Sequence, residues 1–200
     1  MAKRIFITGG IGSGKSTLLD FLAKKGVAAV EADKVGHQVL TFPDTKAELA
    51  EKFGNDIFDQ DGEVMRPALA VKAFASPEKT ALLDSVTQRR VYAESLRQLD
   101  ELAKTHDVVA LEMAILDGRD DFYKNADVVL ALVTSPEVRI QRLIQRGLTE
   151  EDARNRLKNQ VPDEKRIAIS DVVLTNDGTL DEFMHEIEQW WSRFKSRQLS

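Results

Sequence analysis

The sequence contains no cysteine. Disulfide bonds and thiolate metal sites are therefore excluded, and the reducing cytoplasm is the expected location. Long apolar runs are also missing, because the longest, Val128 to Val133, is far shorter than the ~20 residues of a membrane-spanning helix. The N-terminal stretch MAKRIFIT enters a strand pattern at once, so we expect no signal peptide.

An excess of positive charge is missing as well. The formal net charge is -5, which argues against general nucleic-acid binding, because proteins that contact the phosphate backbone usually carry a basic surface. The 200 residues, 42% of them hydrophobic, are enough to bury a core. The composition indicates a soluble domain with neither a nucleic-acid nor a membrane partner.

Five short apolar segments rich in β-branched residues predict the strands of a sheet. Such nearly continuous hydrophobic character is typical of strands that are buried on both faces of a parallel sheet. Helical patterns at 16–25 and 136–146 lie between them, which predicts an α/β fold with helices on both faces. The predicted strands are Ile5–Ile7, Val27–Val30, Val108–Leu111, Val128–Val133 and Val172–Leu174.

Two insertions interrupt this alternation. Residues 44–104 show helical patterns and no convincing strand, which suggests a subdomain over the carboxyl ends of the strands, and residues 139–166 are rich in arginine. We therefore divide the chain into a nucleotide-binding core (1–33, 106–138 and 168–200), a helical acceptor subdomain (34–105) and a lid (139–167). The aromatic stripe in the last helix, residues 180–194, is interpreted as core packing.

A phosphate-binding loop follows the first strand. Gly9–Ser16 satisfies G-x-x-x-x-G-K-[ST] between a hydrophobic strand and an amphipathic helix, which predicts the P-loop NTPase fold. Glycines let successive backbone N–H groups face phosphate oxygens, Lys15 reaches the β- and γ-phosphates, and the Ser16 hydroxyl is placed to ligate Mg²⁺. The residues predicted to bind ATP here are Gly12, Ser13, Gly14, Lys15, Ser16 and Thr17.

Asp33 is the first candidate on the acceptor side. It follows the second predicted strand in the run Glu31-Ala32-Asp33, at the rim of the sheet. A carboxylate there can orient an alcohol and accept its proton while the γ-phosphoryl group transfers. The alternative is that Asp33 caps the helix predicted over residues 34–40, a position that suits aspartate. The residues alone leave both interpretations open.

Several segments along the chain are similar to dephospho-coenzyme A kinases. The glycine-rich loop is generic to P-loop proteins, whereas the motif FG-x-x-I, DG-x-x-x-R, LA, F in the acceptor region is specific to this family. The segments that carry the resemblance are the run from Thr8 to Thr17, Glu31–Val35 with His37, Phe53–Ile57, Asp61–Arg66, Leu69-Ala70, Phe74, Gln141–Leu143, Arg146–Thr149, Arg156, Gln160 and Thr175–Gly178.

The resemblance implies a kinase that transfers the γ-phosphate of ATP to the ribose 3′-hydroxyl of dephospho-coenzyme A. It further implies that Asp33 is the base, that Arg142 clamps phosphates from the lid, and that Asn176 lies in the loop beside the adenine. Arg66 and Thr87 would belong to the acceptor-binding subdomain. The alternative for Arg142 and its neighbouring arginines is a solvated helix face, although their number exceeds what solubility requires.

Two segments depart from the family pattern. Gln88-Arg89 follows Thr87 where the family usually has His-Pro, and Ala114–Gly118 replaces its usual Pro-Leu-Leu-Phe-Glu. Another P-loop small-molecule or nucleotide kinase therefore stays open as an alternative, as does a regulatory paralogue that binds ATP without catalysis. Glu112, at the end of the third predicted strand, either assists Mg²⁺ through water or simply ends the strand.

Overall fold

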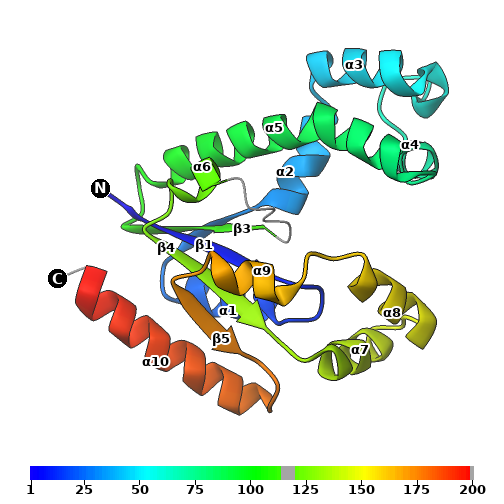
Figure 1. Ribbon diagram of the computed structural model, residues 1–200. Coiled ribbons are helices and arrows are strands. Elements are labelled where there is room, and N and C mark those ends of the chain that lie inside the picture. The colour runs from blue at the N-terminus through cyan, green and yellow to red at the C-terminus, as the bar shows by residue number, and fades with distance from the viewer. Residues whose placement is uncertain (114–119, 199–200) are drawn as a thin grey trace. The chain divides into compact units, whose positions relative to one another are not determined.

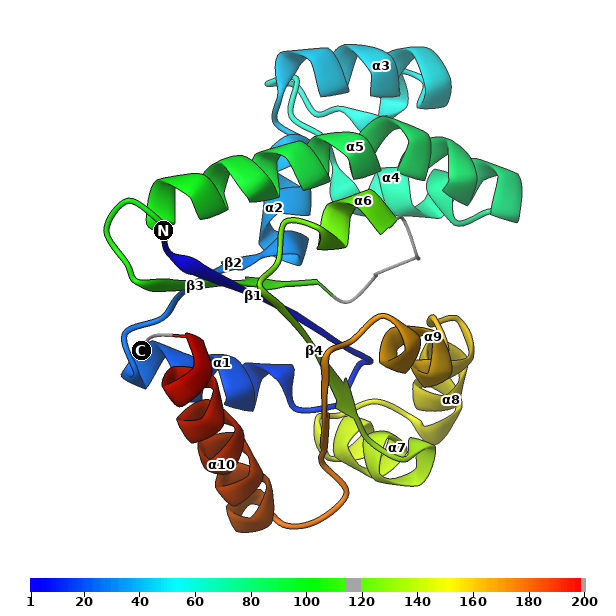
Figure 2. The same ribbon diagram turned by 60° about the vertical axis from the view of Figure 1, so that its left-hand side comes forward.

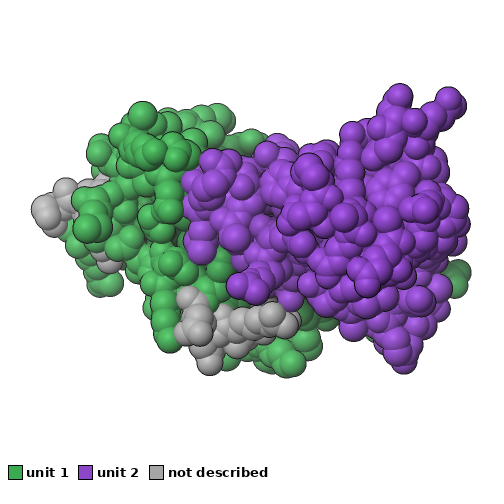
Figure 3. All heavy atoms as spheres, turned by 90° about the horizontal axis from the view of Figure 1, so that it is seen from above, with its two compact units in different colours: residues 1–30, 99–200 green, residues 31–98 purple. Residues whose placement is uncertain are grey.

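The computed structural model describes residues 1–113 and 120–198 (Figure 1). The chain divides into a first compact unit, residues 1–30 and 99–200, and a second, residues 31–98, which Figure 3 distinguishes by colour. The segment Ala114–Gly118, which departs from the family pattern, lies outside the described residues. Each unit has its own hydrophobic core and is considered by itself below.

The five predicted strands form one sheet with the order β2-β3-β1-β4-β5, and the predicted α/β fold class is confirmed. β1 lies at the centre and pairs in parallel with β3 on one side and β4 on the other. β4 in turn pairs in parallel with β5. The strands are β1 (Lys3–Gly9), β2 (Ala28–Glu31), β3 (Val108–Glu112), β4 (Val128–Val133) and β5 (Val172–Thr175).

Helices connect successive strands, as the alternating pattern predicted (Figures 1 and 2). The helices of the first unit are α1 (Lys15–Lys24), α6 (Asp120–Tyr123), α7 (Pro136–Gln145), α8 (Glu150–Lys158), α9 (Asp163–Ala168) and α10 (Leu180–Gln198). Those that begin in the second unit are α2 (Ala32–Val39), α3 (Pro43–Phe53), the 3₁₀ turn η1 (Asn55–Ile57), α4 (Arg66–Ala73) and α5 (Pro77–Leu102). None of these helices is long and apolar enough to cross a membrane.

α1 and α10 lie on one side of the sheet (Figure 2), and alternate residues of β1 pack in one cluster with them. Ile5 and Ile7 of β1 pack there in one cluster with Leu18 and Leu22 of α1, and all four are fully buried. On β1 the intervening residue, Phe6, is also buried, and its ring lies 5.3 Å from that of Phe122 in α6. Burial on both faces explains why β1 reads as a continuous apolar run.

The aromatic stripe of α10 is part of this core, which confirms the packing interpretation. The buried residues that α10 contributes are Phe183, Ile187, Trp190, Trp191 and Phe194. Leu180, at the first position of the helix, is instead 62% exposed.

Replacing Ile187 with Ala tests the role of α10 in the core. Ile187 is fully buried, so the change removes packed methyl groups and leaves a cavity, and we expect a loss of about 2–5 kcal/mol of unfolding free energy. Denaturant unfolding measures this loss. Leu180→Ala on the same helix is the control and is expected to change stability little, because that side chain is exposed.

The second unit is helical, as expected for this part of the chain. Its core contains Leu49 and Phe53 of α3, Ile57 of η1, and Leu69 of α4. The extended backbone near the turn at Gly62 forms a single antiparallel bridge. The helices bring their own hydrophobic faces together, so this unit has a core that is separate from the sheet.

Candidate active site

The phosphate-binding loop follows β1, the central strand, and leads into α1. Gly14 precedes the helix with a φ of 101°, in the left-handed region that residues with a side chain rarely adopt. A Cβ at Gly14 would also overlap the side-chain amide of Asn176. Glycine is therefore required here for both its backbone conformation and its small size.

The start of α1 offers backbone N–H groups to an anion. Ser16 and Thr17 belong to the first turn of α1, whose amides have no acceptor within the helix, and no side chain caps this end. The positive end of the helix dipole adds to the attraction for phosphate. Ser13 is only 1% exposed, and its N–H donates to the Gly10 carbonyl at 3.2 Å.

Lys15 lies folded over the loop in this structure. Its Nζ donates to the carbonyl oxygens of Gly9, at 2.9 Å, and Gly10, at 3.3 Å. Its Nζ also lies 3.5 Å from Oε1 of Glu112, whose side chain is 8% exposed. Glu112, which ends β3, therefore pairs with the lysine of the phosphate-binding loop.

Arg142 reaches the loop from α7. Its Nη1 donates to the Gly12 carbonyl at 3.2 Å and its Nη2 to Oδ1 of Asn176 at 2.9 Å. Asn176, just beyond β5, donates in turn to the Ser13 carbonyl at 2.9 Å, and Thr134, just beyond β4, donates to the same oxygen at 3.3 Å. Residues after three neighbouring strands thus meet at one edge of the sheet, as expected for parallel strands.

Asp33 lies in the second unit, two residues after β2 ends at Glu31. It is exposed and occupies the second position of α2, while Glu31 is the N-cap residue and makes no side-chain capping bond. The alternative interpretation of Asp33 as an N-cap is therefore wrong, because the helix begins two residues earlier than the pattern indicated. A carboxylate in a first turn still interacts favourably with the helix dipole.

Arg66 and Thr87 occupy different settings within the second unit. Arg66 begins α4 and lines a cavity of about 230 Å³ together with His37, Leu40, Thr41, Glu63 and Val64. Thr87 is half-buried on α5, and its hydroxyl donates to the Leu83 carbonyl at 3.0 Å. Thr87 does not line the Arg66 cavity.

Comparison with known proteins identifies the family. The sequence model of the family described as dephospho-CoA kinase matches residues 4–182. This chain belongs to the dephospho-CoA kinase family. A dephospho-CoA kinase of Corynebacterium glutamicum is 40% identical over 196 residues, which cover 97% of this chain and 98% of the relative.

Solved structures agree with the fold. The Thermus thermophilus protein TT1252 superposes with a TM-score of 0.77 at 26% identity, over 96% of this chain and 97% of its own. A dephospho-CoA kinase from Campylobacter jejuni superposes with a TM-score of 0.74 at 23% identity, over 98% of each chain. The family is one of ATP-dependent kinases, so the chain is a kinase.

The residues around the loop are compatible with a Mg²⁺ ion that is bound jointly by the protein and by nucleotide phosphates. Ser16 is exposed in the first turn of α1 and offers a hydroxyl oxygen. Within residues 1–113 and 120–198, no group of three or more His, Asp or Glu side chains could hold a metal ion. Mg²⁺ usually takes one or two protein oxygens and completes its shell with water and substrate phosphates, so a single hydroxyl is compatible with this arrangement.

Sequence reasoning missed part of the contact network of this kinase. Thr134 belongs to no sequence motif, and a single threonine after a strand is common. Its contact with the loop is visible only in the fold. Arg139 and Gln160 were noted only as members of an arginine-rich lid, whereas both contact Ile11 within the loop. The signals available were their position in the arginine-rich segment and, for Gln160, the resemblance to the family.

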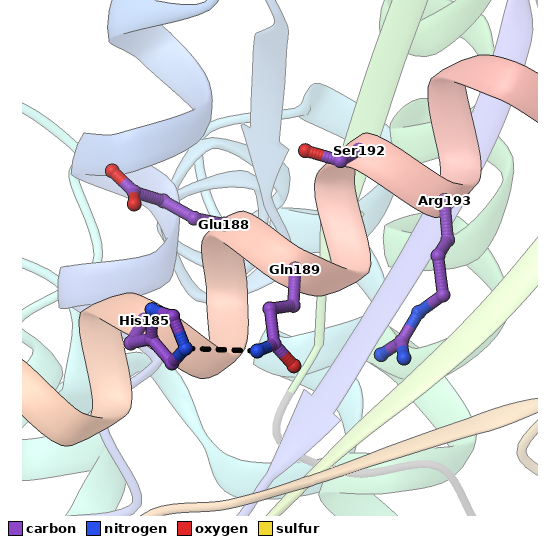
Figure 4. A pocket seen from close by; sticks show the side chains of 5 residues that line it. All are labelled: His185, Glu188, Gln189, Ser192 and Arg193. Atoms are coloured by element: carbon purple, nitrogen blue, oxygen red, sulfur yellow. Dashed lines mark hydrogen bonds between the residues drawn. The ribbon is translucent and has the colours of Figure 1, made fainter.

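A separate pocket of about 400 Å³ lies along α10, lined by His185, Glu188, Gln189, Ser192 and Arg193 (Figure 4). All five residues come from this helix, and Nε2 of Gln189 lies 2.8 Å from Nε2 of His185. None of the predicted site residues lines this pocket. One helix supplies no opposing wall, so we assign no ligand to it.

Proposed function

We propose that this chain transfers the γ-phosphoryl group of ATP to the 3′-hydroxyl of the ribose of dephospho-coenzyme A, giving coenzyme A and ADP. The observation that carries the proposal is the phosphate-binding loop, whose carbonyl oxygens accept hydrogen bonds from Lys15 and Arg142. The chain that contains it matches the dephospho-CoA kinase family over nearly its whole length. Catalysis of phosphoryl transfer depends mostly on positioning and on charge stabilisation, which such a loop supplies.

Within this proposal the loop residues bind the phosphates of ATP. The amides of the first turn of α1 and of Gly12 to Thr17 donate to phosphate oxygens, and Lys15 exchanges its loop carbonyls for the β- and γ-phosphates. The carboxylate of Glu112 keeps Lys15 oriented toward the same edge of the sheet. The lysine thereby stabilises the negative charge that spreads over the γ-phosphoryl oxygens during transfer.

Arg142 contributes a second positive charge from the lid. A guanidinium has five N–H donors, so its bonds to Gly12 and Asn176 leave capacity for phosphate oxygens. Asn176 is 5% exposed and bonds both Arg142 and the Ser13 carbonyl, so we assign it to positioning the ATP site from the adenine-side loop. Arg142 and Asn176 thus connect the loop after β1 to the segment after β5 through hydrogen bonds.

Mg²⁺ would be held by the Ser16 hydroxyl and, when bound, would neutralise negative charge on the phosphates of ATP. The proposed catalytic base is Asp33, whose exposed carboxylate lies two residues after the end of β2. It would accept the proton of the 3′-hydroxyl as that oxygen forms its bond to phosphorus. Arg66 and Thr87, in the helical region 34–105, are proposed to contact the acceptor, and residues 139–167 to close over ATP as a lid.

Two other functions were open from the residues alone. A different P-loop small-molecule kinase would share the loop, and a regulatory paralogue would bind ATP without transferring phosphate. The family assignment favours dephospho-CoA kinase over both, and a protein that only binds ATP has no need for a carboxylate such as Asp33. We also propose that the enzyme acts in the cytoplasm and that its partner there is a small-molecule substrate.

The direct test is a coupled assay of ADP release with ATP, Mg²⁺ and dephospho-coenzyme A. We expect turnover that requires all three, and coenzyme A as the product by mass spectrometry. Shikimate and gluconate serve as control acceptors, because the solved structures of similar fold include a shikimate kinase and a gluconokinase. Transfer to one of these acceptors and none to dephospho-coenzyme A would overturn the proposal.

If Arg142 binds phosphate, replacing it should lower kcat/KM more than replacing Arg146 at the end of the same helix, α7. Arg142→Ala is expected to lower kcat/KM for ATP by about ten- to a hundredfold, because a bond to a charged group contributes about 1.5–3 kcal/mol. Arg146, exposed at the end of the same helix, is expected to show a smaller loss on replacement with Ala. Steady-state kinetics measure both. Equal melting losses with unchanged kinetics would mean that the two arginines are structural.

A further inference from the structure

Both backbone polar groups of Ile11, in the middle of the phosphate-binding loop, are held by two side chains of the arginine-rich segment. Nε of Arg139, on α7, donates to the Ile11 carbonyl at 2.9 Å. Oε1 of Gln160, between α8 and α9, accepts from the Ile11 N–H at 2.9 Å. The two side chains also bond each other, since Nη2 of Arg139 donates to the same Oε1 at 2.6 Å.

The three residues therefore form a closed triangle of hydrogen bonds. A displacement of Ile11 relative to Arg139 or Gln160 would break at least one of the two bonds to its backbone. Arg139 is only 6% exposed, so water has little access to replace a lost bond. Such a triangle restricts the loop far more than a single surface contact would.

Buried ion pairs extend the triangle into α9. Nη1 of Arg139 lies 3.3 Å from Oδ2 of Asp163, and Nη1 of Arg166 lies 2.8 Å from Oδ1 of the same carboxylate. Burial lowers the pKa of the Arg139 guanidinium, the Asp163 charge opposes this shift and Arg166 adds to it. An arginine starts from so high a pKa that it stays charged, so Asp163 fixes the guanidinium in position without changing its state.

The guanidinium of Arg139 also lies against Gly10, the neighbour of Ile11 in the loop. A Cβ at Gly10 would fall within overlap distance of the Nη2, Cζ and Nη1 atoms of Arg139. The guanidinium cannot move aside easily, because Ile11, Gln160 and Asp163 all bond it. Any residue larger than glycine at position 10 would therefore collide with the guanidinium of Arg139.

We infer that Arg139 and Gln160 are positioning residues that hold the phosphate-binding loop in the shape required for ATP. They act on the loop through the backbone of Ile11 and do not need to touch the nucleotide. Ile11 immediately precedes Gly12, the first residue of the phosphate-binding series, so its orientation sets the direction of the amides that follow. This inference rests on the proposed function only in that the loop binds ATP.

Isothermal calorimetry of ATP binding, with the melting temperature measured in parallel, tests the inference. Gln160→Met keeps the side-chain length but removes the acceptor, and we expect about a tenfold weaker Kd for ATP. Arg139→Lys keeps the positive charge but cannot place two donors in a fixed fork, so it should weaken ATP binding by a similar factor. Arg193→Lys, at an exposed position of α10 outside the loop contacts, is the matched control and should leave the Kd unchanged (Figure 4).

Kinetics separate positioning from general damage. Both variants should raise KM for ATP about tenfold and change KM for dephospho-coenzyme A less than about twofold. Full ATP affinity in Arg139→Lys would overturn the inference, since charge alone would then suffice. A lower melting temperature in Gln160→Met with unchanged ATP affinity would also overturn it, because the contact would then be purely structural.

A double-mutant cycle between Gly10 and Arg139 adds an independent test. Gly10→Ala alone should weaken ATP binding about tenfold, because the new methyl group displaces the guanidinium. In an Arg139→Met background the same change should add less than about a twofold loss, since the overlap is gone. Strictly additive effects would overturn the inference. Failure of the wild-type protein to phosphorylate dephospho-coenzyme A would overturn the proposed function alone, because ATP binding does not depend on the acceptor.

Discussion

Replacing Lys15 with Ala is expected to lower kcat by about 10³-fold or more, since one positively charged group at the transferring phosphate contributes a factor of this order. The Nζ group lies over the loop carbonyls in this structure, where it is placed to exchange these contacts for phosphate oxygens. The coupled assay measures the loss at saturating ATP and dephospho-coenzyme A. Turnover near that of the wild type would exclude the loop as the catalytic site.

The stability of this variant needs a separate measurement. Lys15→Ala removes the ion pair with Glu112, whose side chain is only 8% exposed, so some loss of melting temperature is expected. Adding Glu112→Gln removes the buried negative charge and should recover stability without recovering turnover. Lys24→Ala, at the exposed end of the same helix, is the matched control and should retain full activity.

Replacing Asp33 with Asn is expected to lower kcat by about 10²- to 10⁴-fold, the usual contribution of a general base. The amide has nearly the same size as the carboxylate but cannot accept the proton of the 3′-hydroxyl. ATP binding should persist, because Asp33 belongs to the acceptor side of the proposed reaction. Calorimetry with ATP and the coupled assay with dephospho-coenzyme A measure the two effects separately.

The control for Asp33→Asn comes from another helix of the same chain. Asp181 occupies the second position of α10, as Asp33 does in α2, so both carboxylates interact with a helix N-terminus. Asp181→Asn should therefore change the melting temperature by about as much as Asp33→Asn while leaving kcat intact. Full turnover of Asp33→Asn on dephospho-coenzyme A would contradict the assignment of this carboxylate as the base.

The sequence by itself determined the fold class and the position of the phosphate-binding loop. Both depend on local patterns: strands buried on both faces must be apolar throughout, as in β1 and β4, and a loop that wraps phosphate needs glycine at fixed positions. The core role of α10 was equally predictable, since its large side chains recur at helical spacing. Each of these features can be predicted from residues that are close together in the sequence.

Other features depended on where an element begins or on which segments meet. One of the two interpretations left open for Asp33 was a helix cap. The helix instead begins at Ala32, because the choice between a cap and a first turn is made by backbone conformation at Glu31. The contact of Lys15 with Glu112 joins residues 15 and 112, and no spacing rule links them. Parallel neighbours in the sheet bring such residues together through long crossover connections.

The clearest contribution of the tertiary structure is the triangle of Ile11, Arg139 and Gln160. In the sequence Ile11 is an unrestricted position of the loop motif, Arg139 is one arginine of a charged segment, and Gln160 is a residue of the family resemblance with no partner assigned. In the fold, α7 and the turn before α9 bring the last two against the loop, where burial makes each hydrogen bond costly to lose. The motif leaves position 10 open to any residue, and the physical reason for glycine there, the guanidinium that lies against it, depends on a residue more than a hundred positions away.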